Sequence, residues 1–175
     1  VESYKHGDDV RYAVIFRKDG GPQTRAYHGL SANEHQQRFN DWTAAGFRPR
    51  NIAVSAVNGQ PRYTALYEKT DYGQWLAKSR LSAEAYQQAV TENDAKGLKL
   101  IYLNAYGLDG KVWFSAIWSA KPAGAIKARH GLSAQQYQSE WNSAGRSGFL
   151  TRAVTGYAAG NDARSCASHS SCNAA

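Results

Sequence analysis

Three stretches of the chain share a pattern in which aromatic and branched residues alternate in part with polar ones. They lie at 11–17, 62–68 and 113–118. Partial alternation with a period of two is typical of a β-strand that buries one face. Turn-forming residues follow each stretch, and a second short strand is expected after each turn, at 23–28, 74–79 and 125–130.

The pattern becomes helical after each strand pair, where the motif Leu-Ser-Ala begins at Leu30, Leu81 and Leu132. Its serine is a natural N-cap, because the hydroxyl can accept a hydrogen bond from an unpaired amide of the first helical turn. We expect helices over 31–45, 82–96 and 133–144, ended by Gly46, Gly97 and Gly145. A third strand is expected after each helix, at 50–57, 100–106 and 151–158.

The three helix starts are separated by identical intervals of 51 residues, and the interval holds along most of the sequence. Such a fixed interval without insertions is the signature of a tandem repeat. We expect one α+β repeat domain over 1–163, with three strand-strand-helix-strand units and antiparallel hairpins, at 11–61, 62–112 and 113–163. Residues 1–10 resemble the end of a preceding unit, and 164–175 are expected to form a Ser-rich tail. The units could close into a pseudo-threefold ring or form a short open array.

Apolar residues that recur in the units are expected to form a shared core. On the predicted helices they fall at spacings near four and five and make one face. The expected core includes Phe39 and Trp141 on the helices and Phe16, Tyr67 and Trp118 on the strands. Recurrence at core positions explains the fold and leaves function open.

The formal net charge is +7, but the basic excess is spread along the chain rather than gathered in one run or arm. Binding to a nucleic-acid backbone is therefore not expected. The longest apolar stretches are far shorter than the roughly 20 residues of a membrane helix, so no membrane association is expected. The sequence has no methionine and begins at Val1, which leads us to expect a processed product.

The only cysteines, Cys166 and Cys172, lie in the Ser-rich stretch near the carboxyl end. An exposed pair at this spacing favours a small disulfide loop made in an oxidising compartment, with two free thiols as the alternative. We therefore expect a secreted, extracellular protein.

Polar residues gather at the predicted corner between the second strand and the helix of each unit. They are Tyr27, His28, Lys78, Arg80, Arg129 and His130. Because a helix N-terminus presents free amides and a positive dipole end, a basic corner could hold an anion or a sugar hydroxyl. Alternatively, these side chains are solvated turn residues.

Aromatic residues near the turns form a second candidate set, and they are Trp75, Trp113, Tyr106 and Tyr157. An exposed aromatic ring is suited to stacking on the apolar face of a sugar. Burial of these rings is the alternative. From the two sets, we take as candidate ligand-binding residues Tyr27, His28, Trp75, Arg80, Tyr106, Arg129, His130 and Tyr157.

The sequence contains no catalytic or metal-binding motif with diagnostic spacing, and no cofactor is expected. Its five histidines do not form a His-Glu-x-x-His motif, and the two cysteines alone cannot complete a zinc site. No phosphate-binding glycine loop or Gly-x-Ser-x-Gly motif occurs.

The combined pattern resembles a known family. His-Gly-Leu-Ser-Ala before the helix, Gly46-Phe47-Arg48-Pro49 after it, and strands such as 11–16 resemble the bacterial tandem repeat domain of about fifty residues. The second copy departs from this pattern at 78–81 and at Leu98-Lys99-Leu100. The resemblance implies a secreted protein, because the family forms the amino-terminal module of some β-lactamase-like serine hydrolases, including fungal polyglycine hydrolases.

The Ser-x-x-Lys dyad of those hydrolases is absent from this sequence. Without the lysine, a serine lacks a base of that type. We therefore expect a noncatalytic, lectin-like module that binds an extracellular polysaccharide or glycoprotein. The alternatives are a substrate-recognition fragment of a secreted serine hydrolase and an inhibitor or toxin that docks on a protein partner.

Overall fold

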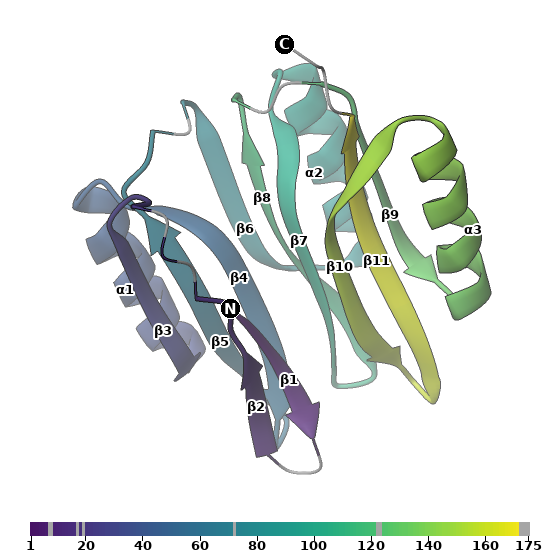
Figure 1. Ribbon diagram of the computed structural model, residues 1–175. Helices are drawn as coiled ribbons and strands as arrows, with labels where there is room; N and C mark the ends of the chain where they lie inside the picture. The colour runs from purple at the N-terminus through teal and green to yellow at the C-terminus, as the bar shows by residue number, and fades with distance from the viewer. Residues whose placement is uncertain (7–8, 17, 19, 72, 122–123, 172–175) are drawn as a thin grey trace. The chain divides into compact units, whose positions relative to one another are not determined.

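The computed structural model describes residues 1–175 except 7–8, 17, 19, 72, 122–123 and 172–175 (Figure 1). The described residues form two compact units, Val1–Tyr72 and Gly73–Ala175. Each unit has its own antiparallel sheets and helices.

The described residues of the first unit form a three-stranded sheet, a helix and a separate two-stranded hairpin. The sheet has the order β3-β5-β4 and comprises β3 (Thr24–Leu30), β4 (Arg48–Val57) and β5 (Gln60–Glu68). Helix α1 (Ala32–Ala44) connects β3 to β4 and contacts β3 and β5. The hairpin of β1 (Glu2–His6) and β2 (Asp9–Ala13) lies against β4.

In the first unit, β3, α1 and the β4–β5 hairpin follow one another as strand, helix and hairpin. The second unit contains this arrangement twice. Its first sheet has the order β6-β8-β7, from β6 (Trp75–Leu81), β7 (Lys99–Leu108) and β8 (Lys111–Ser119), with helix α2 (Ala83–Ala95). Its second sheet has the order β10-β11-β9, from β9 (Ile126–Leu132), β10 (Phe149–Ala159) and β11 (Asp162–Ser171), with helix α3 (Ala134–Arg146). Strands β10 and β11 pack against β7.

The predicted α+β class with three tandem units is confirmed, but the sheets divide the chain at other points than the predicted units. The strands at 62–68 and 113–118 were predicted to open units 62–112 and 113–163. Each of them instead completes a sheet with strands that come earlier in the chain. The strand at 62–68 lies between β3 and β4, and the strand at 113–118 lies between β6 and β7. A periodic sequence has the same period wherever it is cut, and only the hydrogen bonds between strands define the folded unit.

The serine N-caps are confirmed in all three helices, where Ser31, Ser82 and Ser133 accept hydrogen bonds from first-turn amides. The predicted end of the third helix is wrong, because Gly145 lies inside α3. Gly148 has the left-handed φ of 75° that follows the end of the helix. Gly148 lies 51 residues after Gly97, so the repeat interval rather than the nearest glycine locates the end.

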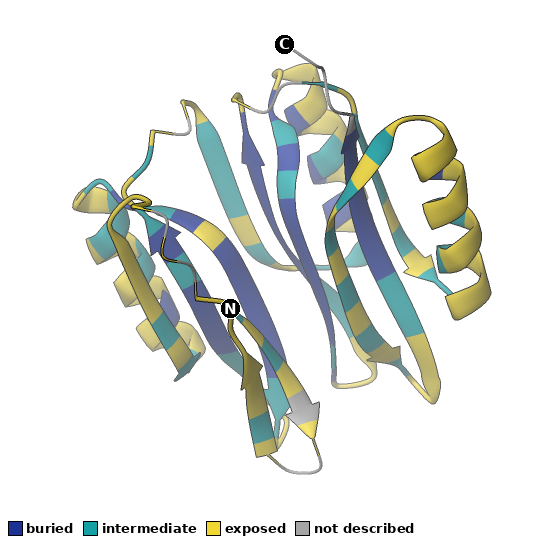
Figure 2. Ribbon diagram, viewed as in Figure 1, coloured by how far each residue is buried: buried dark blue, intermediate teal, exposed yellow. Residues whose placement is uncertain are grey.

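Two predicted core residues are buried as expected, since Tyr67 is 0% and Trp118 is 1% exposed. The predictions for Phe16 and Trp141 are wrong, because these side chains are 87% and 50% exposed. Phe16 follows the end of β2, and no strand among the described residues pairs with it. The buried positions lie mainly on strands, and the outer faces of the helices are exposed (Figure 2).

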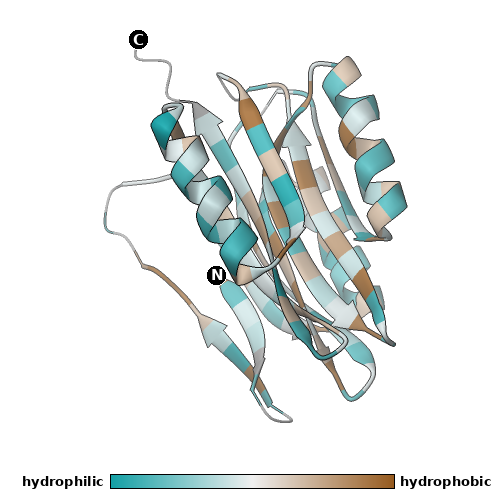
Figure 3. Cartoon of the chain, turned by 90° about the vertical axis from the view of Figure 1, so that its right-hand side faces the viewer, coloured by the Kyte–Doolittle hydropathy of each residue, from teal (hydrophilic) through white to brown (hydrophobic). Residues whose placement is uncertain are grey.

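The predicted Ser-rich tail is also wrong over the described residues, because 162–171 form β11, the middle strand of its sheet. Its side chains are small and polar, which hid the strand from the hydrophobic pattern. Figure 3 shows the contrast between the hydrophobic bands on the strands and the mainly hydrophilic helices. Cys166 is accordingly a buried free thiol in β11, whereas Cys172 lies outside the described residues.

Candidate functional site

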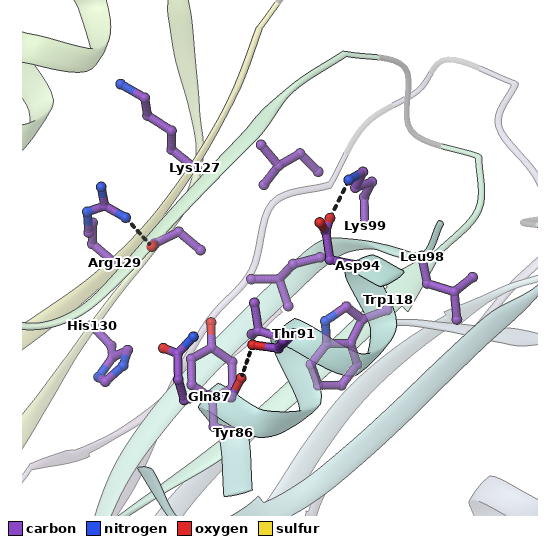
Figure 4. Close-up of a pocket in the computed structure, with 14 residues that line it drawn as sticks. Tyr86, Gln87, Thr91, Asp94, Leu98, Lys99, Trp118, Lys127, Arg129 and His130 are labelled. Atoms are coloured by element: carbon purple, nitrogen blue, oxygen red, sulfur yellow. Dashed lines mark hydrogen bonds and ion pairs between the residues drawn. The ribbon is translucent and has the colours of Figure 1, made fainter. Parts of the chain in front are cut away.

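A cavity of about 440 Å³ lies in the second unit between helix α2 and strand β9 (Figure 4). It has the volume of a typical small-molecule site. Helix α2 and the start of β7 form one side, and residues 126–130 of β9 form the other. We call this cavity the α2–β9 groove. It joins the helix of one repeat to the first strand of the next.

The apolar part of the α2–β9 groove contains Trp118 from the middle strand β8, together with Leu98, Leu100, Val90 and Ile126. The indole Nε1 of Trp118 is buried and has no hydrogen-bond partner among the described residues. A buried donor without a partner costs about 1–3 kcal/mol. A ligand acceptor that reached this N–H would remove that cost.

Three cationic residues line the α2–β9 groove, and the side chains of Lys127 and Arg129 extend from β9 away from its apolar part (Figure 4). The three are Lys99 at the start of β7 and Lys127 and Arg129 on β9. Lys99 forms an ion pair with Asp94 of α2. The Nε of Arg129 lies 3.8 Å from a carboxylate oxygen of Glu140, and its side chain is still half exposed. The Lys127 ammonium lies 4.8 Å from the centroid of the Phe149 ring, and no ion pair of Lys127 is found among the described residues. The residues that line the groove therefore keep a positive excess.

His130 forms one end of the groove and is held between two aromatic rings. Its ring meets Tyr86 edge to face at 5.4 Å and Phe114 at 5.3 Å. Burial lowers the pKa of His130, so its imidazole is neutral at pH 7. A neutral imidazole can donate one hydrogen bond and accept another.

Helix α2 adds hydrogen-bonding groups along the same groove. Gln87 and Thr91 are exposed and line the groove. The Thr91 hydroxyl donates a hydrogen bond to the backbone carbonyl of Gln87 at 3.2 Å. The groove thus combines an apolar base, cations and neutral hydrogen-bonding groups. This combination can hold an anionic molecule that also has an apolar face, and it has no nucleophile paired with a base.

Arg129 and His130 are the only two of the eight predicted binding residues that line the α2–β9 groove. Tyr157 lies beside it as a support, because its hydroxyl accepts a hydrogen bond from the Gly131 amide at 3.1 Å. Burial raises the pKa of Tyr157 to about 12, so its hydroxyl stays protonated. The bond holds the backbone just after His130.

The other predicted residues of the second unit lie elsewhere. Tyr106 is only 4% exposed and cannot act as a surface plate. Trp75 is half-buried at the start of β6, opposite Ser119. The Arg80 guanidinium lies 5.5 Å from the centroid of the Trp113 ring, a cation–π contact within its own repeat.

Tyr27 and His28 lie in the first unit and have local partners. The Tyr27 hydroxyl hydrogen-bonds the Nδ1 of His35 and the hydroxyl of Tyr67. Burial raises the pKa of Tyr27 and lowers that of His35 to about 4, so both groups are neutral. His28 meets the ring of Tyr12 edge to face at 5.0 Å. The side chains of Tyr27, His35 and Tyr67 form a packed aromatic cluster at this corner.

Sequence reasoning missed Trp118, Lys99 and Asp94 as site residues. Trp118 was assigned to the core because the equivalent position of the preceding repeat, Tyr67, is also aromatic. Lys99 lies where the second copy departs from the family pattern, with Leu98-Lys99-Leu100 in place of Phe-Arg-Pro, and this departure was the available signal.

No group of three potential metal ligands occurs among the residues that the structure describes. None of the helices in the described chain is long and apolar enough to cross a membrane.

A family model described as polyglycine hydrolase-like structural repeat matches the chain three times, over residues 21–70, 73–120 and 123–168. The chain belongs to this family. Each match of the polyglycine hydrolase-like repeat begins before the first strand and includes a helix and a hairpin, as the sheets do. The α2–β9 groove therefore lies between the second and third repeats. A comparison with curated protein sequences gives no significant match.

Proposed function

We propose that this protein is a noncatalytic recognition module that acts outside the cell and binds an acidic polysaccharide in the α2–β9 groove. The observation that carries the proposal is the unpaired, buried indole N–H of Trp118 in a groove with Lys127 and Arg129. Together they provide a hydrogen-bond donor in the apolar part of the cavity and positive charge beside it.

A uronic acid fits this chemistry better than a neutral sugar. Its ring has an apolar C–H face, and its carboxylate can accept charge-assisted hydrogen bonds from Lys127 and Arg129. Its ring hydroxyls can bind the neutral imidazole of His130 and the side chains of Gln87 and Thr91. A polymer would place several such residues along the repeats, so that weak single contacts add through multivalency.

The experiment is a calorimetric titration of the full chain with trigalacturonic acid and, as a matched neutral ligand, with its methyl ester. We expect the acid to bind and the ester to bind at least about tenfold more weakly, the equivalent of about 1.4 kcal/mol. The difference should shrink as salt is added, because Lys127 and Arg129 act partly through solvent. Equal affinity for acid and ester would contradict the proposal.

Matched variants locate the binding. Lys127→Ala and Arg129→Ala should each weaken trigalacturonate binding by about tenfold. Lys111→Ala removes the same charge from an exposed position of β8 that does not line the groove, so it should leave the affinity unchanged. If all three variants behave alike, binding depends on net charge and not on the groove.

Recognition of a protein substrate is a second candidate, and the family description favours it. Polyglycine hydrolase-like repeats take their name from enzymes that act on glycine chains. On this alternative, the groove would hold an extended peptide for a hydrolase domain. A titration with hexaglycine that is acetylated at its N-terminus and amidated at its C-terminus separates the two candidates, because this peptide has no carboxylate to pair with Lys127 and Arg129.

A further inference from the structure

Three consecutive apolar residues after β2 are exposed to solvent. Val14, Ile15 and Phe16 are 51%, 88% and 87% exposed. They follow the β1–β2 hairpin of the first unit directly. We call these three residues the hairpin edge.

The repeat interval of 51 residues identifies the counterparts of the hairpin edge. In the next repeat they are 65–67 on β5, and in the one after that they are 116–118 on β8. Ala65 and Tyr67 are fully buried, as are Ala116, Ile117 and Trp118. Leu66, the counterpart of Ile15, is half-buried. The positions of Val14 and Phe16 are therefore inside the protein twice and exposed once.

A strand and a helix bury these counterparts. Strand β3 pairs with β5 through Tyr27–Ala65, Ala26–Leu66 and Arg25–Tyr67. The Trp42 ring of α1 then meets the Tyr67 ring edge to face at 5.1 Å. In the second unit, β6 pairs with β8 at 116–118 in the same register.

The β1–β2 hairpin otherwise occupies the place of a repeat hairpin. Strand β1 packs against β4 as β7 packs against β10. Tyr12 meets His28 edge to face at 5.0 Å, and their counterparts Phe114 and His130 do so at 5.3 Å. No described residue of the first unit pairs with the outer edge of β2.

We infer that the hairpin edge is a docking site for a strand followed by an N-capped helix of this same repeat type. The strand would add antiparallel to 12–16 in the register of β3 on β5, because the main-chain groups of an edge strand are free to pair. An apolar residue of the strand would cover Ile15, and the helix would cover Phe16 as α1 covers Tyr67. The inference is independent of polysaccharide binding.

The test uses the full chain and a labelled synthetic peptide of residues 74–98, which contains β6, the Ser82 cap and α2. Fluorescence anisotropy should show saturable one-to-one binding. Phe16→Glu and Ile15→Glu should each weaken it at least about tenfold. Both side chains are exposed, so neither variant should affect folding, and circular dichroism checks this.

Leu150→Glu is the matched control, because Leu150 is also an exposed apolar strand residue, 53% accessible, but lies in the second unit. It should leave peptide binding unchanged. A shortened peptide of residues 74–81 without the helix should bind at least about tenfold more weakly. Equal binding by the short peptide, insensitivity to Phe16→Glu, or no binding at all would overturn the inference. Self-association of the chain that Phe16→Glu abolishes, without peptide binding, would assign the edge to a second copy instead.

Discussion

The backbone of Gly107 in β7 lies directly against the carbonyl oxygen of Ala158 in β10. A Cβ built on Gly107 would lie 2.6 Å from that oxygen, well inside van der Waals contact. The two residues are 51 positions apart, so they are the same position of consecutive repeats. The second and third repeats therefore make a close backbone contact at Gly107, which has no side chain to keep them apart.

Gly107→Ala should destabilise the protein by about 1–3 kcal/mol, since the obstacle is backbone that cannot rotate away. Gly156→Ala is a suitable control, because a Cβ there meets its nearest atom only at 4.0 Å. Urea denaturation monitored by circular dichroism gives both free energies of unfolding. Similar values for the two variants would show that β7 and β10 can separate without cost.

The corner before each helix requires a left-handed residue, and the three repeats meet this requirement differently. Gly29 and Gly131 have φ values of 68° and 73°, but Arg80 has 57°. A residue with a Cβ costs about 1–2 kcal/mol in this region. We expect Gly131→Ala to be destabilising by about 1 kcal/mol, because only the conformation opposes it and no atom lies within 4 Å.

Arg80→Gly should increase the stability of the protein or leave it unchanged. It removes the left-handed strain but also the contact with Trp113, worth about 0.5–1 kcal/mol at an exposed site. Thermal melting of both variants checks the pair. A large loss of stability in Arg80→Gly would mean that the Trp113 contact outweighs the strain.

Burial of His35 predicts an acid-sensitive first unit. Its pKa is lowered to about 4 by desolvation, whereas an unfolded histidine titrates near 6.5. The unfolded state therefore binds a proton first, and the stability present above pH 6.5 is lost as the pH falls to 4. The full loss is about 3 kcal/mol, from 1.36 kcal/mol per pKa unit.

The free energy of unfolding should be measured from pH 7 to pH 4 for the protein and for His35→Gln. The glutamine keeps an acceptor for the Tyr27 hydroxyl but does not titrate. The difference between the two curves isolates His35 from the other histidines. Parallel curves across this range would contradict a buried neutral His35.

Cys166 should resist thiol reagents while the protein is folded. Burial raises its pKa to about 11, and its side chain is only 1% exposed. At pH 8 a rise of two pKa units lowers the thiolate fraction roughly a hundredfold, and limited access slows the reaction further. In the variant Cys172→Ser, labelling by a disulfide reagent should be at least that much slower in buffer than in denaturant. Equally fast labelling under both conditions would contradict a buried strand at 162–171.

Much of the repeat could be predicted because local chemistry determines it. A serine before a helical pattern caps that helix in every copy, and the hydroxyl and the amides it caps are only three residues apart. Strand β11 could not be predicted, because its serines and alanines lack the alternation that marks a strand. Its place in the middle of a sheet comes from its hairpin with β10 and its pairing with β9.

In the candidate site, too, some residues could be predicted from local sequence and others could not. Arg129 and His130 stand out in the sequence because the corner motif repeats. Trp118 joins them only because β9 and α2 enclose the start of β7 and the end of β8, which no periodic pattern encodes.

By itself, the amino-acid sequence determined that one module of three strands and a helix occurs three times, since capping, turns and apolar alternation act over a few residues. Only the tertiary structure decided which copies of a position are buried. Phe16 and Trp118 are equivalent in sequence, but Trp118 is covered by β6 and Phe16 is exposed. Burial depends on neighbours far along the chain, and identical positions differ when those neighbours differ.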